Sequence, residues 1–274
     1  ATHDHSSLVA CHRSWWTRKF DQGYYDWLLG TICDCFEECR ANAVEATARM
    51  GKKVIAGYYG NRIVPGKLAD NEVIVVSFID EKGVPFAGIV NWAVHSAVCG
   101  PDCTELTSEL AGLTGKKLAE TLGYFPAMIV GAAGDCSDRE FRHGRGIPEV
   151  ERVSTALAAE IARIDVDTPV EFGGIEIQTL YHTVAHDDFH LDLRCAVISL
   201  GGLHLFVFPS ELGSDFGIRM KRECPVQGLV FGYTNGYFEY FLPAWEYGLS
   251  FETEHTQIPK GEPELICDKF CQPR

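Results

Sequence analysis

The spacing of apolar residues predicts three helices along the chain. Residues Asp21–Met50 carry apolar side chains at helical intervals and end beside Gly51, a good stop signal. A helical period also runs through Glu105–Gly123, and Pro148–Ile164 is amphipathic. The sequence therefore predicts one long helix near the start and two further helices in the middle of the chain.

Shorter apolar runs between and after these helices predict strands. Val73–Asp80 and Phe86–His95 are joined by a segment that contains the glycine of a hairpin turn. Four more strands are predicted, at Ala127–Ala132, Val170–His182, Leu203–Phe208 and Gly228–Gly232. Alternating strands and helices predict an α/β fold, with a central mixed sheet and flanking helices in a single domain. The hairpin excludes a wholly parallel sheet.

Length, charge and hydropathy narrow the classes of protein. A chain of 274 residues can bury the core of one domain, and its composition is that of an ordinary soluble globular protein. A formal net charge of −14 disfavours nucleic acid as a partner, because it repels phosphate. The longest apolar stretch, Cys195–Pro209, is too short for a transmembrane helix. The first residues do not form a signal peptide, but one could have been removed, so the compartment stays open and the cytoplasm is slightly favoured.

The chain has eleven cysteines, an odd number that leaves at least one thiol unpaired within the chain. Their spacing matches no structural zinc site, because the Cys-x2-Cys pairs of such sites are missing. Plain thiols, disulfides and a cysteine metal site all stay open, and we assign the cysteines no function.

Several polar residues lie where the predicted apolar strands end. His95 follows one strand, Asp135 and Ser137 follow another, and Glu211 follows a third. The aromatic segment Tyr233–Tyr240 follows the last strand. Because ligands of open α/β sheets bind in the crevice beyond the strand ends, we expect these four segments to converge there.

The pair His3 and His5 is the sharpest local signal for a metal. In extended backbone, residues two apart point to the same side and can address one ion. Alone, the pair also fits a solvated terminus, or adventitious copper or nickel binding by a free amino terminus at Ala1. His95 alone fits a satisfied core histidine, and Glu211 fits a helix N-terminal carboxylate as well as a metal ligand.

A rival histidine series would line one face of a helix at His182, His186 and His190. The strand pattern through Glu171–His182 disfavours that helix. The chain also lacks the nucleophile elbow of serine esterases, the Walker phosphate loop and the Rossmann glycine spacing. Esterase, nucleotide and NAD functions therefore have no motif to support them.

Taken in order, six segments resemble the catalytic domain of the neutral (non-lysosomal) ceramidase family. Residues 1–6, Ala-Thr-His-Asp-His-Ser, are similar to the family's Ala-Thr-His-Thr-His-Ser, and residues 91–95 to its Asn-Phe/Trp-Ala-Val-His. The other matching segments are Leu106–Gly112, Gly134–Ser137, Phe208–Glu211 and Thr234–Tyr240. Six matches in one order make the resemblance specific. It covers most of the chain.

The resemblance implies a zinc site and a set of catalytic residues. The zinc ligands would be His3, His95, Glu211 and Tyr240. The catalytic residues would be His5, Asp135, Ser137 and Arg62. His5 and Asp135 would handle protons and orient a metal-activated water. Ser137 would be a hydrogen-bond donor or a nucleophile, with the donor role favoured, and Arg62 would bind a carbonyl oxygen or an anion.

The sequence therefore predicts a zinc-dependent hydrolase that cleaves an N-acyl or related small amide with metal-activated water. A metal-independent serine hydrolase using Ser137 and a non-catalytic binding module are the alternatives. Departures from the family at Asp138 and Phe251 bear on the substrate more than on the metal. A homo-oligomer is compatible with the sequence.

The family's chains carry a further segment before the Thr-His-x-His motif, whereas residues 1–274 open directly on it and form one metallohydrolase domain in this interpretation. A metal ligand so close to a chain end needs something to hold its strand in place. We therefore expect an N-terminal segment, joined or bound as a companion fragment, to do so.

Overall fold

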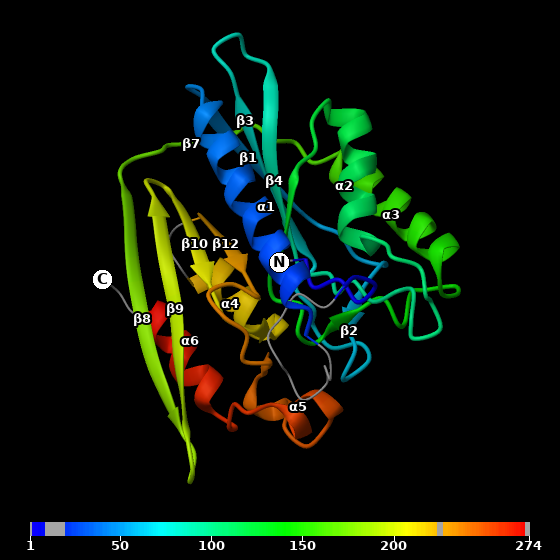
Figure 1. The fold of residues 1–274 in the computed structure, drawn as a ribbon, viewed down its shortest axis with the longest axis vertical. Helices are drawn as coiled ribbons and strands as arrows, with labels where there is room; N and C mark the ends of the chain where they lie inside the picture. The colour runs from blue at the N-terminus through cyan, green and yellow to red at the C-terminus, as the bar shows by residue number, and fades with distance from the viewer. Residues whose placement is uncertain (1, 9–19, 224–226, 272–274) are drawn as a thin grey trace.

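The structure is a computed structural model, which describes residues 2–8, 20–223 and 227–271 (Figure 1). The helices are α1 (Gln22–Ala41), α2 (Glu109–Leu122), α3 (Ile147–Ile161), α4 (Ser214–Glu223), the 3-10 helix η1 (Ala244–Glu246), α5 (Phe251–His255) and α6 (Glu262–Cys271). The first seven strands are β1 (Thr47–Val54), β2 (Gly60–Asn61), β3 (Glu72–Ile79), β4 (Pro85–Trp92), β5 (Ala127–Val130), β6 (Cys136–Ser137) and β7 (Thr168–Val170). The last six are β8 (Ile175–Ala185), β9 (His190–Leu200), β10 (Leu203–Val207), β11 (Glu211–Leu212), β12 (Gln227–Phe231) and β13 (Tyr240–Phe241).

Two mixed sheets form the centre of the molecule. The first has the order β5-β4-β3-β1-β7, in which only β4 and β5 run parallel. The second has the order β12-β10-β9-β8, in which only β10 and β12 run parallel. The predicted α/β class, the mixed pairing and the β3–β4 hairpin are confirmed. The single central sheet is in fact two.

The alternation of side chains along β3 shows how the first sheet is covered on both faces. Val73 and Val75 point into a core shared with α2 and α3, whereas Ile74 and Val76 point into a core shared with the second sheet. All four are buried, because successive side chains of a strand point to opposite faces. The first sheet is therefore a middle layer.

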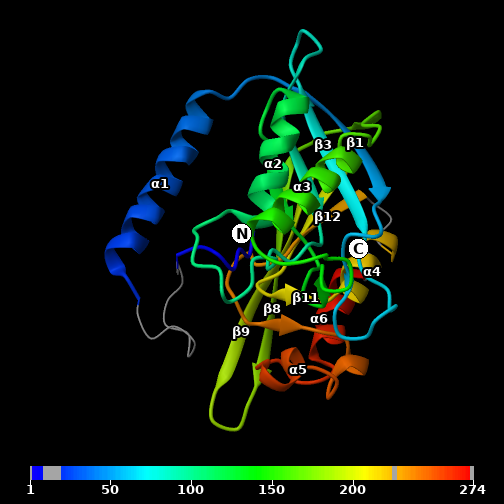
Figure 2. The ribbon, with the colours of Figure 1, turned by 90° about the vertical axis from the view of Figure 1, so that its right-hand side faces the viewer.

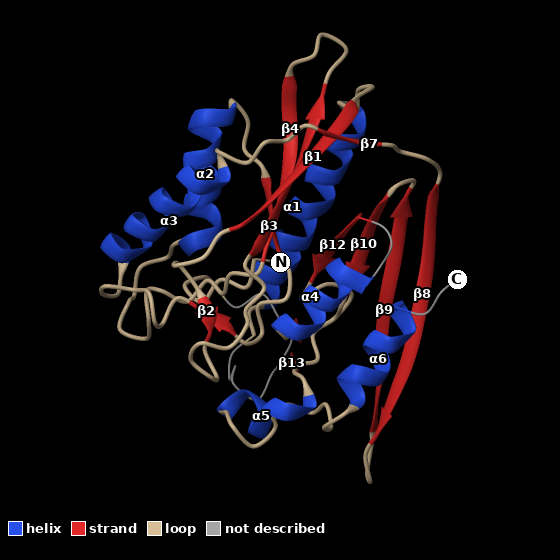
Figure 3. Cartoon of the chain, turned by 180° about the vertical axis from the view of Figure 1, so that it is seen from behind, coloured by secondary structure: helices blue, strands red, loops and turns tan. Residues whose placement is uncertain are grey.

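The second sheet is covered in the same way. In β12, Leu229 and Phe231 face the first sheet, and Val230 faces a core that includes Met220 of α4 and Phe270 of α6. The result is a four-layer α/β/β/α arrangement, with α2 and α3 on one side and α4 and α6 on the other (Figure 3).

The side chain of Asn91 joins the two sheets. It lies in β4 and is buried; its Nδ2 donates to the Val230 carbonyl at 2.7 Å, and its Oδ1 accepts from the Val230 amide at 3.0 Å. The side-chain amide of Asn91 thus forms with Val230 the two kinds of hydrogen bond that a neighbouring strand would form. Because β4, β5, β10 and β12 are aligned in this way, their carboxyl ends meet at one edge.

The helix predicted over residues 21–50 is wrong at its C-terminal end. The helix ends at Ala41, and residues 47–50 belong to β1, where Ala48 and Met50 are buried between the sheets. Pairing of β1 with both β3 and β7 outweighs the local helical spacing. None of the residues of α1 is buried, and the helix stands apart from the sheets (Figure 2).

Other predicted elements are confirmed with shifted ends. Helix α2 begins at Glu109 rather than Glu105, and the run predicted as Val170–His182 is divided between β7 and β8. Sequence patterns missed β9, α4, α5 and α6. The rival histidine series lies on the β8–β9 hairpin instead of a helix, and His182 Nε2 bonds Glu262 at 2.5 Å.

Within the described ranges, no helix is long and apolar enough to cross a membrane. The cytoplasmic location expected from the sequence stays a prediction. No disulfide joins any two of the nine described cysteines. Cys11 and Cys224 lie outside the described residues, as does Ala1.

Candidate metal centre

The centre lies beyond the carboxyl ends of strands from both sheets, as the sequence predicts. His95 follows β4, and Glu211 opens β11 shortly after β10. Strand β11 pairs in parallel with β13, which places Glu211 beside Tyr240 in register. Residues 2–8 bring His3 and His5 to the same place.

Three imidazoles gather around one point. The Nε2 atom of His5 lies 3.1 Å from Nε2 of His3 and 3.0 Å from Nε2 of His95. One ligand atom from each of the three lies within 4.8 Å of the others, which makes them a candidate metal site. Glu211 Oε2 lies 3.4 Å from His3 Nε2 and 3.9 Å from His95 Nδ1. Imidazole nitrogens and a carboxylate oxygen are the kinds of donor that suit zinc.

The imidazoles are held in the neutral form that binds metal. Burial, assisted by the positive charge of Arg62, lowers the pKa of His3 to about 4. Burial, followed by the charge of His3, lowers the pKa of His5 to about 4, and burial lowers that of His95 well below its usual value. At neutral pH all three rings therefore carry lone pairs, which a metal ion requires.

Two tyrosines orient the buried carboxylate of Glu211. The hydroxyl of Tyr237 donates to Oε1 at 2.5 Å, and that of Tyr233 donates to Oε2 at 3.4 Å. Burial raises the pKa of Glu211, and the Tyr237 hydrogen bond opposes that rise. The ring of Tyr233 also stacks on His3 with centroids 4.5 Å apart. The sequence singled out the segment containing these tyrosines but gave neither a role.

Arg62 is fixed against the loop that follows β5. Its Nη2 donates to the Gly134 carbonyl at 2.7 Å and lies 3.4 Å from the Tyr240 hydroxyl, and its Nε forms an ion pair with Glu252 at 3.0 Å. The hydroxyl of Tyr240 therefore meets Arg62. Burial raises the pKa of the Tyr240 hydroxyl, and the negative charge of Glu211 adds to that rise.

Asp135 belongs to a buried hydrogen-bonded group beside Arg62. Its Oδ1 accepts from the amide and the hydroxyl of Ser214 at 2.8 and 2.7 Å, and its Oδ2 accepts from Asn61 Nδ2 at 3.1 Å. Its backbone carbonyl accepts from the Arg62 amide at 2.7 Å. These contacts position Arg62. Among the described residues, no hydrogen bond joins the Asp135 carboxylate to His5, either directly or through a shared side chain.

Ser137 is buried next to this group. Its Oγ accepts from the Arg139 amide at 3.3 Å, and none of the described histidines bonds it. A serine nucleophile needs a base within hydrogen-bond reach, so the geometry supports the donor role over the nucleophile.

The chain itself anchors the segment that carries His3 and His5. The amide of His5 donates to the Ser96 carbonyl at 3.2 Å, and the Thr107 amide donates to the Ser6 carbonyl at 3.1 Å. The Ser6 hydroxyl donates to Glu109 Oε1 at 3.2 Å. The companion N-terminal segment expected from the sequence stays a prediction.

Backbone strain is concentrated at this centre. The described non-glycine residues with positive φ are His3, Glu109, Tyr233, Asn235 and Glu239. His3 and Tyr233 border the imidazole group, Glu109 anchors Ser6, and Glu239 accepts the Glu211 amide through its carbonyl. Such conformations persist where surrounding contacts enforce them, and they cluster at functional sites.

Comparison with known proteins identifies the fold. No family model and no curated protein matches the chain. The fold is similar to neutral ceramidase from Pseudomonas aeruginosa, with a TM-score of 0.76 and 15% identity over 92% of this chain and 55% of that chain. A ceramidase complexed with C2 matches with the same TM-score and identity, over 92% of this chain and 56% of that one. The chain thus spans about half the length of these ceramidases. The resemblance seen in the sequence is confirmed at the level of the fold.

Proposed function

We propose that this protein is a zinc-dependent hydrolase that cleaves an amide bond. The observation that carries the proposal is the group of His3, His5 and His95, three neutral imidazoles gathered beside the buried carboxylate of Glu211. The group stands on a fold shared with two ceramidase structures, and ceramidases by name cleave an amide. Histidine and carboxylate ligands with one open position are typical of hydrolytic zinc sites.

The donor atoms fit a zinc ion held by His3, His95 and Glu211, with Tyr240 beside them. Tyr237 occupies Oε1 of Glu211, which leaves Oε2 directed at the two imidazoles. When bound, zinc supplies a Lewis acid that polarises the amide carbonyl and lowers the pKa of water.

The remaining residues position the substrate and move protons. His5 is neutral at pH 7 and can accept a proton from the attacking water and return it to the leaving nitrogen. Arg62 is fixed by Glu252 and Gly134, so its guanidinium can orient the carbonyl oxygen without reorganisation. The hydroxyl of Ser137, also in the cavity wall, can donate a hydrogen bond.

Metal analysis of the purified protein tests the proposal. We expect about one zinc per chain, hydrolysis of N-acyl amides, and loss of both metal and activity in His95→Ala. His190→Ala, an exposed histidine on the β8–β9 hairpin, is the matched control and should retain both. Full activity in a chelator-treated, metal-free protein would refute the proposal.

The same measurements separate the alternatives. Activity that resists chelators but is lost on treatment with a serine-directed acylating reagent would favour the serine hydrolase. Zinc binding without hydrolysis of any amide in a broad panel would favour the binding module. The contacts of Ser137 favour the zinc hydrolase over the serine enzyme.

A further inference from the structure

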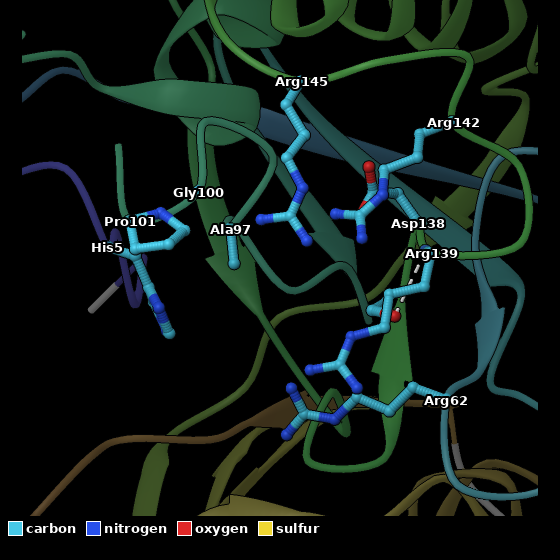
Figure 4. A pocket seen from close by; sticks show the side chains of 10 residues that line it. His5, Arg62, Ala97, Gly100, Pro101, Asp138, Arg139, Arg142 and Arg145 are labelled. Carbon is cyan, nitrogen blue, oxygen red and sulfur yellow. Dashed lines mark hydrogen bonds and ion pairs between the residues drawn. The ribbon is translucent and has the colours of Figure 1, made fainter. Parts of the chain in front are cut away.

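A basic cavity opens directly beside the candidate metal centre. It encloses about 280 Å³, and its wall includes His5, Arg62 and Ser137 of the centre. Three more arginines, Arg139, Arg142 and Arg145, direct their guanidinium groups into the same space (Figure 4). A substrate whose amide lies at the centre therefore extends into a space bordered by four guanidinium groups.

This concentration of positive charge runs against the rest of the molecule. The chain carries 38 acidic and 24 basic side chains, a net charge of −14. In the cavity, two arginines have acidic partners: Arg62 pairs with Glu252 at 3.0 Å, and Arg142 lies 3.9 Å from Asp138. Arg139 and Arg145 form no ion pair with any described residue, so their charge is left for a ligand.

The surroundings of Arg139 disfavour its positive charge. Burial, followed by the positive charge of Arg62 and then that of Arg142, lowers the pKa of Arg139, and the negative charges of Glu252 and Asp138 offset only part of this effect. A bound anion would relieve this repulsion. Guanidinium groups also match the planar oxygens of carboxylate and phosphate through paired N–H donors.

The backbone makes room for Arg145 at Gly100. A Cβ at Gly100 would lie 2.5 Å from Arg145 Nη1, so any larger residue would push the guanidinium away. The φ of Gly100 is also positive, a conformation that glycine adopts without strain. The position of Arg145 against the cavity wall thus depends on a glycine.

The loop that carries these arginines is anchored. The amides of Phe141 and Arg142 donate to the Asp138 carbonyl at 2.8 and 2.9 Å, and the His143 amide donates to Glu149 Oε1 at 2.9 Å. Glu149 belongs to α3, which ties the loop to the first layer of helices. The arginines are therefore presented from a fixed loop.

We propose that this cavity is an anion subsite and that the amide which the protein cleaves carries a carboxylate, phosphate or sulfate close to the scissile bond. The inference rests on the proposed function. Hydrolysis breaks the C–N bond, joins the water oxygen to the acyl carbon and passes a proton to the leaving nitrogen. The smallest substrate of this class is an N-acyl amino acid, whose carboxylate lies two bonds from the amide nitrogen.

Matched substrates test the inference. N-hexanoylglycine and its nearly isosteric neutral partner N-hexanoylglycinamide differ in charge, and we expect kcat/KM for release of hexanoate to be roughly 10- to 100-fold higher for the acid. N-hexanoylethanolamine and its phosphate form a second pair, and the larger preference of the two assigns the subsite to carboxylate or phosphate. Equal kcat/KM within both pairs, in a protein that hydrolyses all four, would overturn the inference and leave the proposed function intact.

Substitutions of Arg139 and Arg145 test whether these residues cause the preference for the charged substrate. Arg139→Gln and Arg145→Gln should raise KM for the charged substrate with little change in kcat, and should leave the neutral partner unaffected. Arg163→Gln, an exposed arginine at the end of α3, is the control. Unchanged kinetics in the double variant would place the charge recognition elsewhere and overturn the proposal.

A binding measurement keeps the two proposals apart if no amide is hydrolysed. Calorimetric titration of N-hexanoylglycine and N-hexanoylglycinamide into the parent and the Arg139→Gln/Arg145→Gln double variant does not depend on turnover. Binding of the acid that the double variant loses would support the subsite even if the proposed function failed. Equal binding of both compounds, or binding of neither, would overturn it.

Discussion

Gly134 lies between Arg62 and the backbone of Glu211 and Leu212 in the candidate metal centre. Its amide donates to the Leu212 carbonyl at 2.8 Å, and its own carbonyl accepts from Arg62. A Cβ at this position would lie 2.5 Å from the carbonyl oxygen of Glu211. That oxygen belongs to the backbone and cannot swing away, so only glycine fits between Arg62 and Glu211.

Gly134→Ala should therefore displace the Glu211 backbone and weaken zinc binding by about tenfold or more, although no proposed ligand is changed. The measurement is the zinc dissociation constant by competition with a chelator. Gly174→Ala is the control, because a Cβ there meets nothing within 4 Å. Equal zinc affinity in the two variants would show that the close approach at Gly134 does not position Glu211.

The proposed metal ligands could be predicted from the sequence, but the residues that orient them could not. The resemblance named His3, His95 and Glu211, and the structure brings them together. Tyr233 and Tyr237 went unassigned, because a hydroxyl that holds a carboxylate from more than twenty positions away leaves no periodic signal. Their aromatic-rich segment was the available signal.

At the scale of elements, the start of α2 connects the histidine-bearing segments. Glu109 is fully buried there; its Oε2 accepts from the Val98 amide at 2.8 Å and its Oε1 from the Cys99 amide at 2.9 Å. Its Oε1 also accepts from Ser6. One carboxylate thus holds the loop after His95 and the segment that carries His3 and His5.

Glu109→Gln should lower zinc affinity by about tenfold, because an amide cannot accept all three hydrogen bonds and leaves a buried donor unsatisfied. The zinc dissociation constant and the melting temperature of the metal-free protein measure the two effects. Glu105→Gln, an exposed carboxylate just before the helix, should change neither. Zinc affinity unchanged by Glu109→Gln would contradict this positioning role.

The ends of elements were the least predictable feature. Residues 47–50 have helical spacing as a continuation of α1, yet they pair with β3 and β7 and bury Ala48 and Met50. Local spacing does not report a partner strand more than a hundred residues away. The β3–β4 hairpin was predicted correctly because its turn and both strands are adjacent in sequence.

For the whole molecule, the class of fold could be predicted from the sequence, but the number of sheets could not. The run Val73, Ile74, Val75, Val76 is apolar on both faces, which indicates a strand in a middle layer. What covers the second face is decided by the Asn91–Val230 contact and by strands β10 and β12. Those are tertiary pairings without a local signature.

The four layers also bury an acid that makes the stability of the whole molecule depend on pH. Glu246, in η1, is fully buried, and its carboxyl group lies beside the side chains of Asn61 and Asp135. Burial, followed by the negative charge of Asp135, raises the pKa of Glu246 from 4.5 to about 9. Between these values the folded protein keeps a proton that the unfolded chain has lost.

The free energy of unfolding should therefore be highest below the unfolded pKa of 4.5 and fall as the pH rises towards 9, by up to about 1.4 kcal/mol per pH unit from this group. Glu246→Gln keeps the shape of the protonated acid and removes this loss. The variant should exceed the parent in urea stability at pH 8 and approach it near pH 5. Glu254→Gln, on the exposed side of α5, should follow the parent at both pH values. A Glu246→Gln curve parallel to that of the parent would mean that the buried acid is not protonated in the folded state.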